Sequence, residues 1–329
     1  MTGEMIPSRM VVPLISVVIP TFQRPQCVLK AVQSALGQTL KELEVIVVMD
    51  GYDQETADTL STVEDSRLRL MHLPEKAGGN PARNLGCKAA KAEWIAVLDD
   101  DDIWLPEKLE RQWAFANERA RPGIFTVVAC QAVQRMPGAS ILIPRRPPSP
   151  DEPFSEYTVI RKGLTYGDGH VQTSTILAPA KLFREVLWDG TRTIFQEMDW
   201  LLKVLSRKDT QLAILMEPLS IWEAGEQVDR LSIMHSKWEN TFQWTSNMRS
   251  YFTPRAYGAL LCTIIADQAS RCRGWAASRQ VFQEIRQYGK PSIKEWFLFA
   301  YISLLPGKVR RRLREQIAVI LNQTPTSGI

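Results

Sequence analysis

Four consecutive aspartates, Asp99–Asp102, directly follow an apolar run that ends at Leu98. Like charges this close raise one another's pKa and oppose compaction, so the pattern calls for a compensating cation. Mg²⁺ and Mn²⁺ prefer oxygen ligands and commonly combine one or two carboxylates with substrate phosphates. The cluster therefore predicts a divalent cation that holds a phosphate-bearing ligand. The alternative is a solvated acidic turn that caps the helix expected after Leu105.

Three further polar segments come at the ends of expected strands or at the start of an expected helix. They are Pro20–Arg24, Met49–Gly51 and Gly78–Asn84. Open α/β proteins bind ligands at the carboxyl edge of the sheet, where the ends of parallel strands meet. The convergence of these segments with the aspartates favours a binding site over a solvated turn.

The order and spacing of these motifs resemble those of the family-two glycosyltransferases, which are inverting enzymes of the GT-A fold. The stretches that carry the resemblance are Ser16–Arg24, Leu43–Gly51, Asn80–Gly86 and Trp94–Leu109. Weaker similarity continues to about Ser232.

The resemblance implies a nucleotide-diphosphate sugar donor, UDP-linked, and a Mn²⁺ or Mg²⁺ cofactor. Carried over by position, Asp101 faces the metal, Arg83 the diphosphate, Asp50 the nucleobase, and Asp99 the ribose or base. The full set of donor-binding candidates is Pro20, Thr21, Arg24, Asp50, Arg83, Asp99 and Asp100. The family usually has two acids after the second strand, whereas this chain has Met49 and Asp50, so one polar contact to the base is missing.

An inverting transfer needs a carboxylate that takes the acceptor's proton. The segment Phe195–Lys203 resembles the family's acidic base motif, with Glu197 at the place usually held by aspartate. At helical spacing, Glu197 falls on the apolar, inward face and Asp199 points away. Asp199 also precedes Lys203 by four residues, as in a surface ion pair. Glu197 is therefore the favoured catalytic base and Asp199 the alternative, while a first-turn acid favoured by the helix dipole is the purely structural explanation.

His170 is a candidate on the acceptor side, although a lone histidine more often forms a structural hydrogen bond. The tryptophans of the second half could stack on sugar rings, but at helical spacing aromatic residues are usually part of the core. Their positions are 200, 222, 238 and 244.

Two other functions use a similar sheet. A sugar-phosphate nucleotidyltransferase would carry a glycine-rich basic loop after the first strand, where this chain has Pro20–Arg24. A catalytically silent binding protein would bind the donor without turnover and would leave Glu197 exposed and far from the metal.

The elements that must position these residues follow an alternating pattern. Between Ile15 and Asp102, β-branched runs alternate with helical patterns, which predicts a doubly wound, mostly parallel α/β sheet. Asn80 followed by Pro81 predicts a helix that is N-capped by Asn80. The stretch 137–153 is rich in proline and arginine and predicts a loop, and 171–177 predicts a strand. We expect a catalytic domain over residues 1–228 and a helical extension over 229–329.

Composition is that of an ordinary soluble enzyme, with 45% apolar and 23% charged residues. The formal charge of +4 is spread along the chain and gives little support to nucleic-acid binding. Five cysteines without a CxxC pair suggest reduced thiols, and the N-terminus lacks an apolar signal segment, so we expect a cytoplasmic protein.

The C-terminal region combines apolar and basic residues. In Val309–Leu321, apolar residues recur on one helical face with arginines around it. This pattern fits a helix on the inner face of a membrane as well as one packed on the domain. Together with the apolar run before Pro306, it makes 296–321 a candidate for peripheral membrane contact. The expected acceptor is a saccharide or, if the membrane contact holds, a lipid-linked saccharide.

Overall fold

The structure, a computed structural model, describes residues 12–136, 138–161, 168–223, 238–271, 275–305 and 309–310. The chain divides into two compact units. The first comprises Met1–Pro150 and Gly163–Ile233, and the second comprises Asp151–Lys162 and Met234–Ile329. The boundary expected at 228 lies outside the described residues, between Glu223 and Trp238, and a short segment near residue 155 belongs to the second unit.

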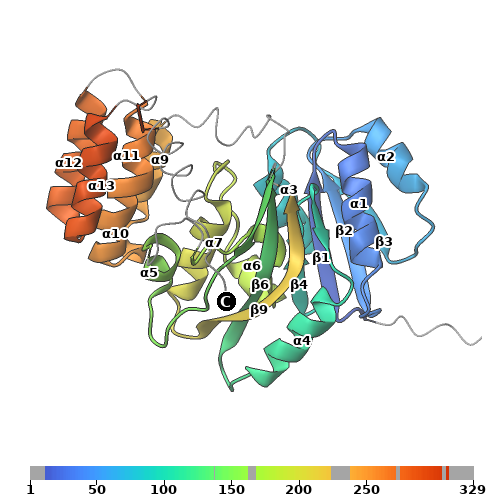
Figure 1. The fold of residues 1–329 in the computed structure, drawn as a ribbon. Helices are drawn as coiled ribbons and strands as arrows, with labels where there is room; N and C mark the ends of the chain where they lie inside the picture. The colour runs from blue at the N-terminus through green and yellow to red at the C-terminus, as the bar shows by residue number, and fades with distance from the viewer. Residues whose placement is uncertain are drawn as a thin grey trace, which may run out of the picture. The chain divides into compact units, whose positions relative to one another are not determined.

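The described part of the first unit is built on one nine-stranded sheet in the order β3, β2, β1, β4, β8, β6, β9, β5, with β7 on β6 (Figure 1). The strands are β1 (Ile15–Thr21), β2 (Leu43–Met49), β3 (Leu68–His72), β4 (Trp94–Val97), β5 (Asp102–Trp104), β6 (Phe125–Met136), β7 (Ala139–Ile143), β8 (Leu177–Pro179) and β9 (Thr210–Glu223). Strands β1 to β4 are parallel to their neighbours within that group, as are β6 and β9, whereas β5, β7 and β8 run antiparallel. The predicted α/β class is confirmed.

The parallel half of the sheet forms the core of the first unit. Every residue of β1 and β2 is buried, as expected for strands that are covered on both faces. The helices of this unit are α1 (Pro25–Leu36), α2 (Gln54–Ser61), α3 (Gly79–Ala89), α4 (Lys108–Glu118), α6 (Ala180–Glu185) and α7 (Gln196–Leu205). Pro25 opens α1 in the first turn, where its missing N–H has no consequence.

The start of α3 differs from the prediction. The N-cap is Gly78, whose φ of 106° is the left-handed region that glycine tolerates, and the helix begins at Gly79. Asn80 therefore lies in the first turn and is buried. Its amide group donates to the carbonyl oxygens of Asp189, at 2.7 Å, and Arg192, at 3.3 Å, so it anchors a distant loop rather than capping the helix.

Two other predictions were wrong in detail. The stretch expected to be a loop, 137–153, contains β7, which pairs with the long strand β6 and turns at Gly138 with φ 75°. The stretch expected to be a strand, 171–177, instead forms a 3₁₀ turn at Thr173–Thr175 that leads into the short β8. Its polar residues bind the acid cluster described below, which explains why the backbone leaves the extended conformation there.

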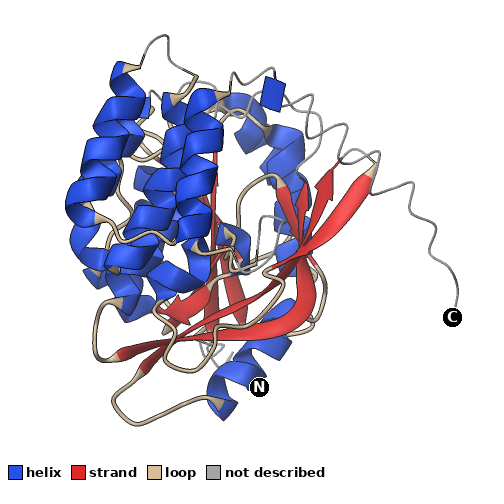
Figure 2. Ribbon diagram, turned by 60° about the vertical axis from the view of Figure 1, so that its left-hand side comes forward, coloured by secondary structure: helices blue, strands red, loops and turns tan. Residues whose placement is uncertain are grey.

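The second unit is helical in its described residues (Figure 2). It contains α5 (Phe154–Val159), α9 (Trp238–Asn247), a 3₁₀ turn (Arg249–Tyr251), α10 (Pro254–Leu260), a π-helical turn (Leu261–Ile265), α11 (Ala266–Ala269), α12 (Ala276–Tyr288) and α13 (Ile293–Leu304). Thr253 caps α10 and donates from Oγ1 to Oε1 of Glu156 at 2.8 Å, which ties α5 to this unit. The predicted helical C-terminal region is thus confirmed.

The membrane-related predictions fall mostly beyond these helices. None of the described helices combines the length and the apolar character needed to cross a membrane. The predicted amphipathic helix Val309–Leu321 lies outside the described residues except for Val309 and Arg310.

Gly86 provides a test of how closely α3 packs on the sheet. A Cβ atom at this position would lie 2.5 Å from Val18 Cγ1 and 3.1 Å from Val48 Cγ2. Because both valines are fully buried, we expect Gly86→Ala to lower the free energy of unfolding by about 1–3 kcal/mol, despite the better helix propensity of alanine. The measurement is chemical denaturation.

The matched control is Gly79→Ala, in the same helix, where an added Cβ meets nothing within 4 Å. That variant should be as stable as the wild type or slightly more stable. Equal stability of the two variants would contradict the close contact between α3 and β1.

Candidate active site

The acid cluster Asp99–Asp102 and the three other polar segments meet at one edge of the sheet, as predicted. Strands β1, β2 and β4 are parallel neighbours, and the register pairs Thr21 with Met49. The backbone N–H of Asp50 donates to the carbonyl oxygen of Thr21 at 2.8 Å. The carboxyl ends of β1 and β2 and the loop after β4 therefore lie side by side. Pro20 is buried within β1, directly before this edge.

Thr21 and Arg24 bind the two central residues of the acid cluster, Asp100 and Asp101. Thr21 Oγ1 donates to Asp100 Oδ2 at 2.7 Å, and Arg24 Nη1 lies 3.1 Å from both Asp100 Oδ1 and Asp101 Oδ2. Burial raises the pKa of Asp100 to about 6, although Arg24 and Thr21 act in the opposite direction. Asp101 differs from its neighbours because 49% of its side chain is exposed, against 10% for Asp100.

Arg83 forms the second cationic contact to the cluster. Its Nη2 donates to Asp99 Oδ1 at 2.7 Å, and its Nη1 donates to Asn80 Oδ1 at 2.5 Å and to Gln196 Oε1 at 3.2 Å. The guanidinium carbon lies 4.7 Å from the centre of the Trp188 ring. These contacts fix a buried guanidinium between α3, the segment Asp99–Asp102, which we call the acid loop, and the start of α7. Asp99 keeps 30% of its side chain exposed, whereas Arg83 keeps 4%.

Asp102 is buried beneath the other three aspartates. Its Oδ2 accepts from Gln172 Nε2 at 2.6 Å and from Ser174 Oγ at 2.5 Å, and Ser174 Oγ also accepts from the backbone N–H of Asp99 at 3.0 Å. Within the described residues Asp102 Oδ1 has no hydrogen-bond partner. Burial first, and then the charges of Asp99 and Asp101, raise the pKa of Asp102 well above its ordinary value. Asp102 is therefore best suited to a structural role beneath the cluster.

Gln172 and Ser174 are not among the predicted site residues. The available signal was the polar run Gln172–Thr175 inside a stretch that otherwise reads as buried. Both side chains are indeed buried, and their hydrogen bonds orient the acid loop from below.

Asp50 supports the loop that leads into α3. Its Oδ1 accepts from the N–H groups of Ala77 at 2.6 Å and Gly78 at 2.9 Å, and its Oδ2 accepts from Gly78 at 2.8 Å. The carboxylate thereby holds Gly78 in its left-handed conformation and sets the position of the first turn of α3. In this structure both oxygens of Asp50 thus bind backbone amides.

Glu197 lies in the first turn of α7, close to the Arg83–Asp99 pair. The residue before this helix, Phe195, has a left-handed φ of 57° and forms the N-cap. Burial raises the pKa of Glu197 to about 7; the charge of Asp99 raises it further, while the backbone N–H of Glu197 and the charge of Arg83 lower it. The half-buried carboxyl group therefore lies within electrostatic reach of the cluster.

Asp199 does not lie where its helical phase predicted. It forms the expected ion pair with Lys203, with 2.7 Å between Lys203 Nζ and Asp199 Oδ2, but only 1% of its side chain is exposed. The prediction of a surface position was wrong because α7 is covered on more than one side: residues 198–202 are all buried. One turn of this helix thus presents two acids in different environments, and Asp199 is the one paired with a lysine.

His170 stacks on Trp222, with ring centroids 5.6 Å apart and 24° between the planes. Burial lowers the pKa of His170 to about 4, so the imidazole is neutral near pH 7. Trp222 pairs with Asp102 across β5 and β9, which places the stacked rings next to the strand that follows the acid loop. The other three tryptophans considered for sugar stacking, at 200, 238 and 244, are buried in the cores of their units.

The described residues contain no group of three or more His, Cys, Asp or Glu side chains arranged to hold a metal ion. Mg²⁺ and Mn²⁺ do not need such a cage, because they readily combine one or two carboxylates with phosphate and water oxygens. The half-exposed carboxylate of Asp101, with Asp99 and Asp100 beside it, fits a cation of this kind that is shared with a phosphate-bearing ligand. These residues do not fit a metal site made of protein ligands alone.

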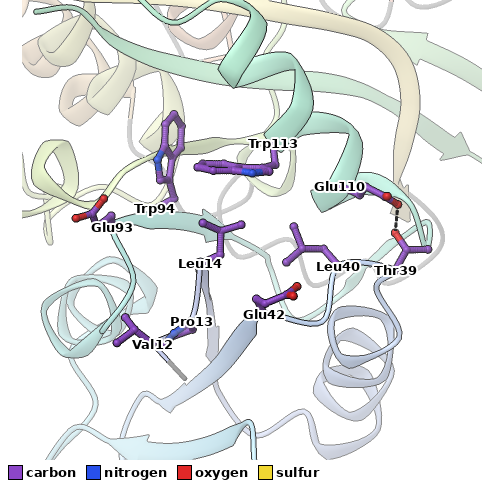
Figure 3. A pocket seen from close by; sticks show the side chains of 10 residues that line it. All are labelled: Val12, Pro13, Leu14, Thr39, Leu40, Glu42, Glu93, Trp94, Glu110 and Trp113. Atoms are coloured by element: carbon purple, nitrogen blue, oxygen red, sulfur yellow. Dashed lines mark hydrogen bonds between the residues drawn. The ribbon is translucent and has the colours of Figure 1, made fainter. Parts of the chain in front are cut away.

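A separate cavity of about 740 Å³ lies at the opposite, amino edge of the sheet (Figure 3). Leu14, Glu42 and Trp94 line it at the starts of β1, β2 and β4, and Trp94 packs edge-on against Trp113 at 5.4 Å between centroids. Because β1, β2 and β4 are parallel, this cavity is separated from the acid cluster by the length of the strands. It is therefore not part of the candidate site.

Comparison with known sequences gives one family and several relatives. Residues 16–160 match the sequence model of Glycosyl transferase family 2. TuaG of Bacillus subtilis, named for teichuronic acid biosynthesis, is 34% identical over 127 residues, which cover 38% of this chain and 50% of TuaG. WfaP of Escherichia coli, named as a β-1,3-glucosyltransferase that uses UDP-Glc and α-D-GlcNAc-diphosphoundecaprenol, is 34% identical over 102 residues, 31% of this chain and 41% of WfaP. The matches thus span half or less of these relatives' lengths.

Two solved structures resemble this chain in fold. S. aureus TarS 1–349 in complex with UDP-GlcNAc superposes with a TM-score of 0.58 at 14% identity, covering 88% of this chain and 79% of that one. The mannosyltransferase PcManGT of Pyrobaculum calidifontis, in complex with GDP-Man and Mn²⁺, has a TM-score of 0.53 at 15% identity, covering 90% and 88%. At such identities the likeness concerns the fold alone. The chain thus has the GT-A fold, and its residues 16–160 are similar to the glycosyl transferase family 2.

Proposed function

We propose that this chain is an inverting glycosyltransferase that moves a sugar from a UDP-linked donor to an acceptor hydroxyl. One observation carries the proposal: the exposed Asp101, the Arg83–Asp99 pair and the weakly acidic Glu197 gather at the carboxyl edge of a GT-A sheet. A scaffold protein would not need a carboxyl group with a pKa near 7 beside such a cluster.

The donor half of the site consists of the acid loop and its basic partners. The residues proposed to contact the donor are Pro20, Thr21, Arg24, Asp50, Arg83, Asp99 and Asp100. Arg83 and the N-terminus of α3 would stabilise the negative charge of the departing nucleoside diphosphate. A Mn²⁺ or Mg²⁺ ion held by Asp101 would supply further positive charge to the diphosphate when bound.

The acceptor half centres on Glu197. The acceptor oxygen attacks the anomeric carbon, the bond from that carbon to the diphosphate breaks, and the hydroxyl proton passes to the Glu197 carboxylate. A pKa of about 7 suits this role because the group is partly ionised at neutral pH and still basic enough to take a proton. Asp199 is the weaker candidate, since Lys203 already pairs with its carboxylate. His170 stays a proposed contact on the acceptor side.

The biological role is proposed at the level of a class. The names of TuaG and WfaP refer to teichuronic acid biosynthesis and to a diphosphoundecaprenol-linked acceptor. They support polysaccharide or glycolipid assembly, with a saccharide or lipid-linked saccharide as acceptor. A catalytic domain that ends near residue 228, a cytoplasmic location and attachment to the inner face of a membrane remain parts of this proposal.

The deciding experiment is a thermal-shift screen of nucleotide sugars with Mn²⁺ and Mg²⁺, followed by product analysis of the donor that binds. Release of nucleoside diphosphate and an inverted anomeric configuration by NMR would support the proposal. Pyrophosphate release from a nucleoside triphosphate and a sugar phosphate would instead establish a nucleotidyltransferase. Donor binding without any turnover would establish a silent binding protein.

Replacing Glu197 should lower the transfer activity without lowering the stability of the protein. Glu197→Gln removes the proposed base, so we expect the rate of sugar transfer to fall by about 10²–10⁴-fold. In the wild type, kcat/KM should rise with pH through about 7 as Glu197 ionises.

The stability of the wild type should fall over the same pH range in which its kcat/KM rises. Because folding raises this pKa from 4.5 to about 7, ionisation destabilises the folded state progressively as pH rises through that window. Glu197→Gln should therefore raise the melting temperature at about pH 8 and not at about pH 4. A fully active variant would exclude Glu197 as the base.

Asp199→Asn is the matched comparison in the same helix turn. It leaves Lys203 without its carboxylate partner, so we expect the free energy of unfolding to fall by about 2 kcal/mol, measured by chemical denaturation. Transfer should stay within about tenfold of the wild type, because the proposed base is untouched. An inactive but stable Asp199→Asn variant would assign the base to Asp199 instead.

Asp101→Asn tests the cation. We expect the variant to lose the part of donor-induced stabilisation that depends on Mn²⁺, as measured by thermal shift with and without the metal, because only the carboxylate attracts the ion. The exposed Asp58→Asn on α2 is the control and should behave like the wild type. Unchanged metal dependence in Asp101→Asn would contradict the assignment.

A further inference from the structure

The outer side of α13 is apolar and has no partner among the described residues that covers it. Ile293, Phe297 and Leu304 are 77%, 73% and 62% exposed. Their spacing of four and seven residues puts them on one side of the helix. The opposite side, with Glu295 and Phe299, is buried against the rest of the unit. The exposed residues are thus a stripe rather than scattered surface positions.

Helix α12 packs beside α13 and carries exposed aromatic residues of its own. Phe282 is 40% exposed, and its ring lies 5.8 Å from that of Trp296 and 6.2 Å from that of Phe299, both on α13. Trp275, 68% exposed, precedes Phe282 by seven residues and lies on the same side of α12. We call the residues Trp275, Phe282, Ile293, Phe297 and Leu304 the α12–α13 patch.

The exposed charged residues of α12, α13 and the loop between them are all positive. Arg279, Arg286, Lys290 and Lys294 are all exposed. The stretch 275–305 contains two acids, and both are covered. Glu284 keeps 15% of its side chain exposed and accepts from the Tyr257 hydroxyl at 2.6 Å, and Glu295 is 7% exposed and caps α13. Exposed aromatic and aliphatic side chains next to these four cations are complementary to an anionic, partly apolar partner.

We propose that the α12–α13 patch docks onto an anionic lipid surface. The apolar side chains would enter the boundary between headgroups and acyl chains, and the four cations would face the anionic headgroups. An aqueous environment gives no compensation for a contiguous apolar stripe of this kind. Because no described helix can cross a membrane, the unit lies on the bilayer surface in this proposal. The inference does not depend on sugar transfer and would stand if the chain had another activity.

The test is co-sedimentation of the full chain with phosphatidylcholine vesicles and with vesicles that also contain phosphatidylglycerol, at low and high salt. The wild type should bind the anionic vesicles, and salt should weaken binding. Phe297→Ser combined with Leu304→Ser should lower the partition coefficient by about tenfold or more. Lys290→Glu combined with Lys294→Glu should lower it on anionic vesicles by about fivefold or more per lysine. All four positions are exposed, so the variants should keep the wild-type melting temperature.

Two exposed residues of the first unit serve as matched controls. Leu142→Ser removes an apolar side chain that is 44% exposed, and Lys208→Glu reverses an exposed charge; neither should change vesicle binding. Absence of binding by the wild type, or equal loss in the control variants, would overturn the proposal. A dimer that forms without lipid and dissociates in the Phe297→Ser, Leu304→Ser variant would overturn it as well, by showing a protein interface at the patch.

Discussion

The pairing of two arginines with a run of four carboxylates is the interaction on which the candidate site depends. Two unit charges 5 Å apart near a protein surface repel by about 3 kcal/mol, so an unbalanced Asp99–Asp102 loop would not stay compact. Arg24, at the start of α1, balances Asp100 and Asp101, and Arg83, on α3, balances Asp99. Both arginines are positioned by elements that follow β1 and precede β4. The parallel order of these strands is therefore also what brings the countercharges to the acids.

The four carboxylates have different surroundings and therefore different roles. Asp102 is buried on Gln172 and Ser174, Asp100 is clamped by Thr21 and Arg24, and Asp99 is bound to a buried guanidinium. Asp101 is half exposed, and Arg24, its one ion-pair partner among the described residues, is itself 37% exposed. Exposed pairs of this kind contribute little to stability. Asp101 can thus exchange its partner for a soluble cation at the least cost, and this is a property of burial rather than of sequence order.

The sequence predicted the features that depend on local pattern. The mostly apolar strands β1 and β2, the position of the acid loop after β4 and the Asp199–Lys203 spacing all follow from short-range periodicity and composition. What it did not predict depends on contacts between distant segments. Asn80 reads as an N-cap, but Asp50, thirty positions earlier in the chain, holds Gly78 in place and moves the start of the helix. Asp199 reads as a surface acid because a helical wheel shows one inward face, whereas α7 is enclosed on several sides. Gln172 and Ser174 gain their role only when the chain folds back beneath Asp102.

The pKa of Glu197, on the acceptor side, is influenced by Arg83 and Asp99 on the donor side. Burial is the main cause of its raised pKa, and the charges of Asp99 and Arg83 act on it in opposite directions, so the Arg83–Asp99 pair modulates a value that burial largely sets. Gln196, the neighbour of Glu197, accepts a hydrogen bond from the same guanidinium, which makes the link structural as well as electrostatic. Any ligand that changes how Arg83 and Asp99 share their charge must therefore change the basicity of Glu197. A negative group that draws Arg83 away from Asp99 leaves more negative charge beside Glu197 and makes it a stronger base, whereas added positive charge at the acid loop makes it a weaker one. Occupancy of the acid-loop side is thus expected to adjust the proton affinity of Glu197 on the α7 side, through contacts that are present before any ligand binds.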